Sequence, residues 1–385
     1  MSGISCDASK RRLFNVSVNV KVKIFMNKSQ ELLFELLLVC TGAKNSLRQS
    51  YTEKEWSDAL EIAINQVISG VLVTVFDVLK EHDAGSLPSR HLMLEWMGLS
   101  QLQELDTAKL TKAGETAIKY FRENGFACQI LKGSSVGRYY PHPLKRASGD
   151  VDVWLDGSRK KIYDFARNFD KDGKLYGVNY QHIHFHLIEG VHIEVHIWPS
   201  YLSNPLHNHR LHKFCNMYRP TMESDKTSPA FDRVLILLHC YQHFCGHGVG
   251  LRQIMDYFYV LKQGFTEEER RDSAKWIKKL GMKRFAEGLM WVLQQYFGLE
   301  KQYMLFEPNE KEGRFIIQEV LQTGNMGHCE TRNWGSLETP VSRFFYNLRR
   351  DMYFATHYPH EALWKPFFSL CVYAWRLSLG RMKDE

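Results

Sequence analysis

The stretch that decides the fold is residues 130–155, ILKGSSVGRYYPHPLKRASGDVDVWL. An apolar run ends in Lys132-Gly133-Ser134, a loop rich in proline and basic residues follows, and a second apolar run contains Asp150 and Asp152. Because successive side chains of a strand point to opposite faces, both carboxylates are expected on one face and the neighbouring valines on the other. The stretch therefore predicts two strands joined by a turn and a long loop.

The two aspartates indicate a site for a hard divalent cation. Neighbouring carboxylates repel each other unless positive charge lies between them, and Mg²⁺ is commonly bound through one or two carboxylates plus substrate phosphates. Mn²⁺ suits the same oxygen ligands. The alternative is a solvated strand edge with two aspartates that bind nothing. The turn at Gly133 and Ser134, where backbone N–H groups could approach a phosphate, favours the metal site.

A third carboxylate, Glu194, lies in residues 191–198, where apolar and polar residues alternate strictly. The run before it alternates in the same way, which predicts a β-hairpin. A two-residue loop would place Phe185 opposite Glu194 and mix the two faces. A three-residue loop, with Gly190 in the left-handed conformation, places His184 opposite Glu194 and keeps the faces consistent, so we expect this register.

Helical patterns flank this central region. Apolar residues recur at helical spacing from residue 29 to about 123 and again from residue 229 onward, with a polar break near residues 324–335. We therefore predict an α+β chain in which strands occupy the middle. The expected divisions are an extension that is non-native or disordered (1–25), a helical N-terminal region (26–111), an α+β core (112–215) and a helical C-terminal domain (225–385).

The motifs around the strands resemble the polymerase-beta-like nucleotidyltransferase superfamily, although the spacer, residues 135–149, is longer than the common pattern. More narrowly, the chain resembles an uncharacterised nucleotidyltransferase family of Bacteroidetes and related bacteria, often linked with surface-polysaccharide genes. The likeness spans roughly residues 26–380. It is carried by Leu131-Lys132-Gly133, Tyr140-Pro141, Arg146, Gly149-Asp150-Val151-Asp152-Val153-Trp154, Glu194-Val195-His196 and Gly248-Val249-Gly250-Leu251-Arg252-Gln253.

The resemblance implies both a fold and a reaction. The fold is a nucleotidyltransferase-fold mixed sheet with flanking helices, set between helical N- and C-terminal regions. The reaction is Mg²⁺-dependent transfer of a nucleotidyl group from NTP to a hydroxyl of a small molecule, sugar or protein, with a link to surface-polysaccharide metabolism. Asp150, Asp152 and Glu194 would form the catalytic and metal-binding triad.

The resemblance also implies a nucleotide-binding set on the loops around the triad. Its members are Lys132, Gly133, Ser134, Arg146 and Arg252, with the backbone turn and the cationic side chains contacting phosphates. Arg252 follows a glycine-rich break that predicts the start of a helix, where anions bind readily. It could equally pair with Asp256 one helical turn later.

Two other functions stay open at this point. One is a noncatalytic nucleotide sensor or assembly protein on the same fold. The other is a transition-metal-binding protein, because five histidines lie on the predicted hairpin: His182, His184, His186, His192 and His196. These imidazoles could instead line a polar cleft and orient Glu194, with His184 and His196 as accessory residues. A second pair, His239 and His243, shares one helical face and is better explained by packing in the core or cleft.

Charge, cysteines and hydropathy exclude several classes of protein. Residues 1–25 contain five basic residues and one acidic residue, so they contribute +4 of the net charge of +7. The nearly neutral remainder makes a nucleic-acid partner unlikely. Eight scattered cysteines without a CxxC pair predict a reducing, cytoplasmic location. The apolar residues 362–380 include Lys365 and Arg376, which argues against a membrane span. Nothing in the sequence indicates the oligomeric state.

Overall fold

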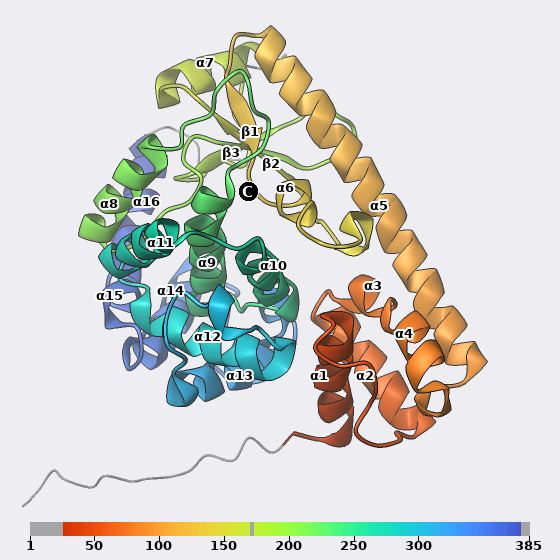
Figure 1. Cartoon of the computed structure of the whole chain (residues 1–385). Helices are drawn as coiled ribbons and strands as arrows, with labels where there is room; N and C mark the ends of the chain where they lie inside the picture. Colours follow the sequence, from red (N-terminus) through yellow and green to blue (C-terminus); the bar gives the residue numbers. More distant parts are fainter. Residues whose placement is uncertain (1–25, 170–172, 379–385) are drawn as a thin grey trace, which may run out of the picture.

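A computed structural model describes residues 26–169 and 173–378, and the predicted extension, residues 1–25, lies outside the described part. The N-terminal region is helical, as predicted (Figure 1). Its elements are α1 (Lys28–Cys40), α2 (Glu53–Asn65), α3 (Ser69–Leu72), α4 (Val75–His82), the 3₁₀ turn η1 (Ala84–Ser86) and α5 (Arg90–Glu123). Helix α5 has 34 residues and runs without a break from the N-terminal helices to the sheet, across the expected division at residues 111 and 112.

The sheet is mixed and has four strands, which confirms the predicted fold class. Its strands are β1 (Cys128–Ile130), β2 (Val151–Leu155), β3 (His182–Phe185) and β4 (Ile193–His196), in the spatial order β1-β2-β4-β3. Strand β2 is antiparallel to β1 and parallel to β4, and β3 is antiparallel to β4. The connecting elements are α6 (Ser134–Gly137), the 3₁₀ turn η2 (Pro143–Lys145), α7 (Arg159–Phe169) and α8 (Pro205–Asn216).

The predicted hairpin register is confirmed, because His184 lies opposite Glu194 in the β3–β4 ladder. Gly190 has φ +68°, the left-handed conformation expected in the loop. The ladder itself ends at Phe185 and begins again at Ile193, so the connection is longer than three residues. The pairing of residues is still the predicted one, because each strand is shorter by the same number of residues next to the turn.

The two faces of the sheet pack against different parts of the chain. One face presents valines and isoleucines such as Val153 and Val195 to a core that also contains Ala117 and Phe121 of α5 and Ile162 of α7. The opposite face carries the acidic residues and Trp154, whose ring stacks on Phe231 at a centroid distance of 5.6 Å. Phe231 belongs to the first helix of the C-terminal region, so that region lies against the polar face.

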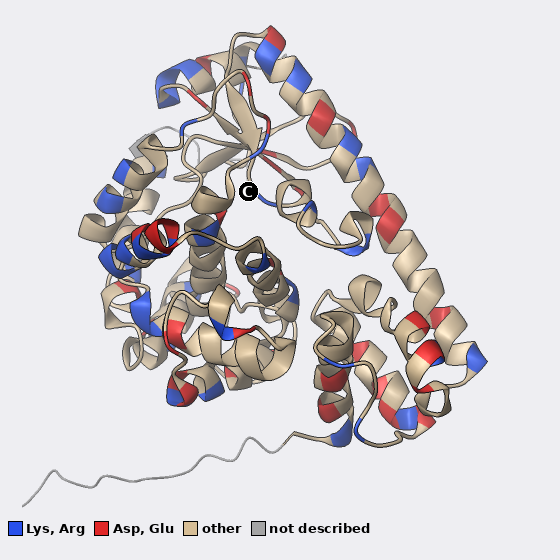
Figure 2. Cartoon of the chain, in the orientation of Figure 1, with Lys and Arg blue, Asp and Glu red and all other residues tan. Residues whose placement is uncertain are grey.

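The C-terminal region is helical to the end of the described part, as predicted. Its elements are α9 (Pro229–Cys245), α10 (Leu251–Lys262), α11 (Glu267–Lys279), α12 (Lys283–Phe297), η3 (Lys301–Tyr303), α13 (Glu310–Thr323), η4 (Asn325–Gly327), α14 (Pro340–Ala355), α15 (Pro359–Ala362) and α16 (Lys365–Ser378). Figure 2 shows acidic and basic residues interspersed along the helices, and α11 carries acids in its first turn and lysines in its last, as its dipole favours. Among the described helices, none combines the length and the apolarity that crossing a bilayer requires.

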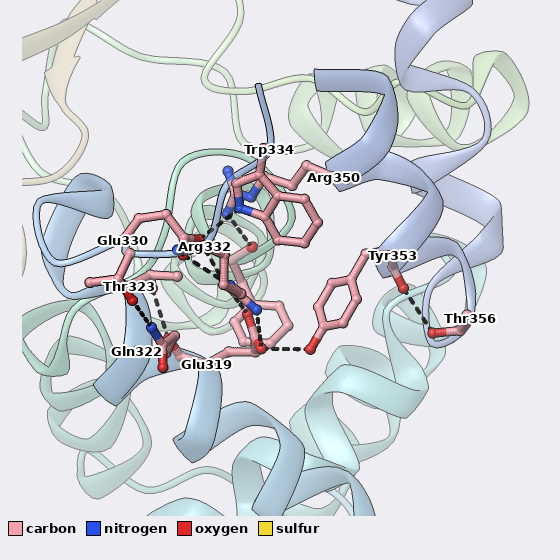
Figure 3. Close-up of polar contacts among 11 residues, drawn as sticks. Glu319, Gln322, Thr323, Glu330, Arg332, Trp334, Arg350, Tyr353 and Thr356 are labelled. Carbon is pink, nitrogen blue, oxygen red and sulfur yellow. Dashed lines mark hydrogen bonds and ion pairs between the residues drawn. The ribbon is translucent and has the colours of Figure 1, made fainter. Parts of the chain in front are cut away.

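The predicted polar break after α13 is held by a network of ion pairs. Arg332 donates to both carboxylate oxygens of Glu319 at 2.9 Å and also contacts Glu330 (Figure 3). The same segment supports the start of α10, because a Cβ on Gly250 would lie 2.9 Å from the Cβ of Asn325. The ion-paired loop therefore fixes the helix end that carries Arg252.

Candidate active site

Three carboxylates meet on the polar face of the sheet. The parallel β2–β4 register places Asp152 directly opposite Glu194, and Asp150 lies two residues earlier on the same face. Asp152 is 2% exposed, whereas Asp150 and Glu194 are half-buried. The negative charge of Asp152 and burial together raise the pKa of Asp150, as expected for acidic groups that share one site.

The loop after β1 brings a positive charge to these carboxylates. The backbone N–H of Leu131 donates to the carbonyl oxygen of Asp152 at 3.0 Å, and Lys132 Nζ lies 2.8 Å from Asp152 Oδ1. Burial would lower the pKa of Lys132, but the neighbouring carboxylates raise it above its ordinary value. Gly133, at φ +51°, then turns the chain into α6, which begins at Ser134. The predicted residues Lys132, Gly133 and Ser134 therefore lie beside the triad.

His196 provides a second positive charge beneath the site. Its side chain is fully buried, and its Nε2 lies 2.6 Å from Asp152 Oδ1 and 3.3 Å from Glu194 Oε2. Burial would lower the pKa of His196, but the two carboxylates raise it to about 9. The reciprocal effect lowers the pKa of Asp152, because Lys132 and His196 outweigh the burial that would raise it. Two cationic side chains, Lys132 and His196, therefore favour the ionised form of Asp152.

The donor set fits a divalent cation. The second oxygen of Asp152, Oδ2, is buried and has no hydrogen-bond partner among the described residues. One potential ligand atom each from Asp152, Glu194 and His196 lies within 4.8 Å of the others, and while His196 is cationic only the two carboxylates of this group can bind an ion. A buried, ionised and unpartnered oxygen is costly unless a cation or a donor faces it, and carboxylate oxygens are the ligands that Mg²⁺ and Mn²⁺ prefer.

The two predicted nucleotide-binding arginines occupy different environments. Arg146 is 5% exposed and forms two hydrogen bonds to Asp256, from Nε at 2.9 Å and from an Nη at 2.6 Å. Asp256 also accepts a hydrogen bond from Tyr140 at 2.7 Å. The charge of Arg146 is therefore already neutralised, and this arginine ties the loop before β2 to α10.

Among the described residues, Arg252 has no acidic hydrogen-bond partner. It donates to the carbonyl oxygen of Ala147 at 2.9 Å, and its buried Nε has no hydrogen-bond partner among the described residues. The alternative pairing with Asp256 is not what the structure shows, because Arg146 and Tyr140 occupy that carboxylate. Arg252 is close enough to Asp150 for the two charges to interact. It is the arginine of the pair that retains donors for a ligand.

Three residues outside the predicted set also face the site. His182 Nδ1 lies 3.0 Å from Glu194 Oε2, and Glu194 is therefore flanked by two imidazoles. Burial would raise the pKa of Glu194, but His182 and His196 lower it far below its ordinary value. On α9, His239 and His243 lie 4.4 Å apart between ring centroids, close to the charges of Lys132 and Arg252. Their spacing of four residues was the only sequence signal, and it did not show which wall they would face.

Together these residues define a class of site. A mixed sheet carries paired aspartates on one strand, an acidic residue on the parallel neighbour and a glycine-serine turn beside them, an arrangement that fits the nucleotidyltransferase fold. A comparison with protein families supports this class: the model described as "Uncharacterised nucleotidyltransferase" matches residues 52–298, more than half of the chain. The chain therefore belongs to this uncharacterised nucleotidyltransferase family, which implies an NTP substrate. Neither the curated proteins nor the solved structures searched contain a match.

Proposed function

We propose that the protein transfers a nucleotidyl group from an NTP to a hydroxyl acceptor in an Mg²⁺-dependent reaction. The observation that carries the proposal is the pairing of Asp152 with Glu194 beside Lys132, with Asp150 two residues before Asp152 and with Asp152 Oδ2 unpartnered in the described structure. In this reaction the acceptor oxygen forms a bond to the α-phosphorus, the bond to the bridging oxygen breaks, and pyrophosphate leaves. Mg²⁺, when bound by the triad, neutralises the triphosphate and the charge on the attacking and leaving oxygens.

The side chains around the triad have separable roles in this proposal. Lys132 and Arg252 would contact the phosphates, and the turn at Gly133 and Ser134 would receive them with backbone N–H groups. Arg146 would act indirectly, by holding the loop before β2 against α10. A cation on each side of the triphosphate would orient it for in-line attack.

The proton of the acceptor hydroxyl needs a base. Glu194 is a weak base, because His182 and His196 beside it lower its pKa far below the ordinary value. Asp150, half-buried and with a raised pKa, is the more basic of the triad carboxylates. We assign the proton-accepting role to Asp150 and the orienting role to Glu194.

The acceptor class includes sugars, other small molecules and protein hydroxyls, with surface-polysaccharide precursors as one group to test. The nucleobase preference and the acceptor are best found with a panel of all four NTPs and these acceptor groups. Three acidic positions argue against a noncatalytic sensor, because binding of a nucleotide alone requires fewer of them.

The test compares pyrophosphate release by wild type with Asp150→Asn and Asp152→Asn, with and without Mg²⁺. We expect wild type to release pyrophosphate only with Mg²⁺, and each variant to lose at least about a hundredfold in rate because a charge that acts on the transition state is removed. Lys160→Ala, an exposed change on α7, serves as a control for handling. Equal rates in wild type and the aspartate variants would overturn the proposal. Tight NTP binding by wild type without turnover on any acceptor would favour the noncatalytic sensor.

A further inference from the structure

We propose that His182, His184 and Glu194 form a second metal site, selective for a transition-metal ion such as Zn²⁺, next to the proposed Mg²⁺ site. The three residues converge from β3 and β4: His182 Nδ1 lies 3.0 Å from Glu194 Oε2, and His184 Nε2 lies 4.0 Å from Glu194 Oε1. One ligand atom from each of the three lies within 4.8 Å of the others. Tetrahedral Zn²⁺ with bonds of about 2.1 Å separates its ligand atoms by roughly 3.4 Å, a spacing that small side-chain adjustments reach here.

The strand geometry explains why these atoms converge. His182 and His184 are two residues apart on β3 and therefore share its polar face. Glu194 lies directly opposite His184 in the antiparallel ladder, where side chains of paired residues are neighbours. The site is therefore built on two paired strands of the sheet, a rigid support for metal ligands.

His182 Nδ1 and Glu194 Oε2 form a close contact whose geometry also suits a shared cation. Although the two atoms are 3.0 Å apart, His182 Nδ1 is buried and has no partner in hydrogen-bond geometry among the described residues. Two ligands that point toward a common ion approach each other without aligning a proton between them. A buried imidazole nitrogen this close to a carboxylate oxygen is placed to coordinate an ion together with it.

His184 is held in place by contacts outside the proposed ligand set. Its backbone N–H donates to the carbonyl oxygen of Tyr176 at 2.9 Å. A Cβ on Gly177 would lie 2.2 Å from Cγ of His184, so only glycine allows the chain to cover this ring. Gly177 also has φ +51°, a conformation that favours glycine. A ring packed in this way is pre-oriented for binding.

The ligand chemistry separates this site from the Mg²⁺ site. Two imidazole nitrogens and one carboxylate oxygen suit Zn²⁺ and its neighbours, whereas Mg²⁺ prefers oxygen ligands and binds imidazole poorly. A set of two histidines and one acid leaves a coordination position open, at which water or an alcohol can be ionised near neutral pH. Activation of the acceptor hydroxyl by such an ion would rest on the proposed function, but metal binding itself would not.

The experiment measures Zn²⁺ binding by protein purified without a polyhistidine tag, stripped with a chelator and titrated against a chromophoric competitor in excess Mg²⁺. Wild type is expected to bind about one Zn²⁺ per chain, and His182→Asn and His184→Asn to weaken binding at least about tenfold. The matched control is His186→Asn, a change of the same chemistry at the exposed end of the same hairpin, which should bind as wild type does. Circular dichroism of each variant checks that the fold is retained.

X-ray absorption of Zn²⁺-loaded wild type provides a measurement that needs no variant. Two imidazole ligands in the scattering pattern would support the site, and an all-oxygen shell would overturn it. Failure of wild type to bind Zn²⁺ in excess Mg²⁺ would also overturn the proposal, as would unchanged binding in both histidine variants. Loss of Zn²⁺ in Asp152→Asn but not in His182→Asn or His184→Asn would assign the ion to the cluster of Asp152, Glu194 and His196 instead. Neither measurement depends on nucleotidyl transfer.

Discussion

The proposed site has a sheet wall, formed by β2 and β4, and a helical wall, formed by α9 and α10. The pKa of His196 on the sheet wall and that of His243 on the helical wall are shifted in opposite directions. On the sheet wall, His196 lies between Asp152 and Glu194, which raise its pKa to about 9 although burial alone would lower it. On the helical wall, burial lowers the pKa of His243 to about 3, and the charge of Lys132 acts in the same direction. The same side chain is therefore cationic beneath the carboxylates and neutral on α9.

This difference shows how charge is divided across the site. The sheet wall concentrates negative charge and balances it with Lys132 and His196. The helical wall carries Arg252, and its imidazoles stay neutral because a further positive charge there would be unpaired and buried. A metal-bound triphosphate, which joins cations to anionic oxygens, would meet complementary charges on two walls of this kind.

Breaking the ion pair between the loop before β2 and α10 should have the largest effect on the free energy of unfolding. Arg146→Met leaves Asp256 as a buried charge without its cation, which we expect to cost about 3–5 kcal/mol in the free energy of unfolding. Urea denaturation measures this cost. Arg146→Met combined with Asp256→Leu should recover part of it, because no lone charge remains. A cost below about 1 kcal/mol for the single change would mean that this ion pair does not hold the walls together.

Raising the pH should remove the contribution that His196 on the sheet wall makes to the free energy of unfolding. An unfolded histidine has a pKa near 6.5, so the raised pKa of His196, about 9, stabilises the fold below pH 6.5. That stabilisation, up to about 3 kcal/mol, is lost as the pH rises through 9. In metal-free buffer, His196→Gln should therefore lose less stability than wild type between pH 6 and 10. Parallel pH profiles for the two proteins would contradict the assignment of a cationic His196.

Lowering the pH should reduce the contribution that neutral His243 on the helical wall makes to the free energy of unfolding. Because the pKa of His243 is lowered to about 3, its neutral form stabilises the fold above pH 6.5, and this contribution falls as the pH drops toward 3. Between pH 7 and 5 the expected loss from this residue is up to about 2 kcal/mol. For His243→Gln, the free energy of unfolding from urea denaturation should fall less between pH 7 and pH 5 than it does for wild type. An equal fall in the two proteins would show that another group titrates.

Arg252 should affect ligand binding and leave stability nearly unchanged. Its free donors and its proximity to Asp150 predict that Arg252→Gln weakens binding of Mg²⁺-NTP by about tenfold, and that Arg252→Lys weakens it less. Equilibrium binding of a fluorescent NTP measures the change. If Arg252→Gln binds the nucleotide normally but unfolds more easily, Arg252 is a structural residue like Arg146.

Local sequence patterns predicted the strands well. Strict alternation along residues 191–198, combined with Gly190, was sufficient to predict the pairing of His184 with Glu194. The clustering of Asp152 with Glu194 required a family resemblance, because the parallel β2–β4 pairing joins residues 42 positions apart. Within the hairpin, by contrast, a short loop limits the choice of register.

Long-range polar contacts could not be predicted in the same way. The hydrogen bonds between Arg146 and Asp256 span 110 residues. From the sequence, Arg252 could pair with Asp256 as readily as contact a nucleotide, and only the packing of the loop before β2 against α10 shows that Arg146 is the partner of Asp256. Likewise, helical spacing placed His239 and His243 on one face but could not show that this face meets the sheet.

The central claim is that the triad holds the metal-bound phosphates of an NTP. Its most direct test is calorimetric titration of a nonhydrolysable NTP analogue into wild type and Asp152→Asn, with and without Mg²⁺. We predict that Mg²⁺ tightens binding to wild type at least about tenfold and has little effect on Asp152→Asn, because the unpartnered carboxylate oxygen is lost. The same Mg²⁺ dependence in both proteins, or none in wild type, would contradict the claim.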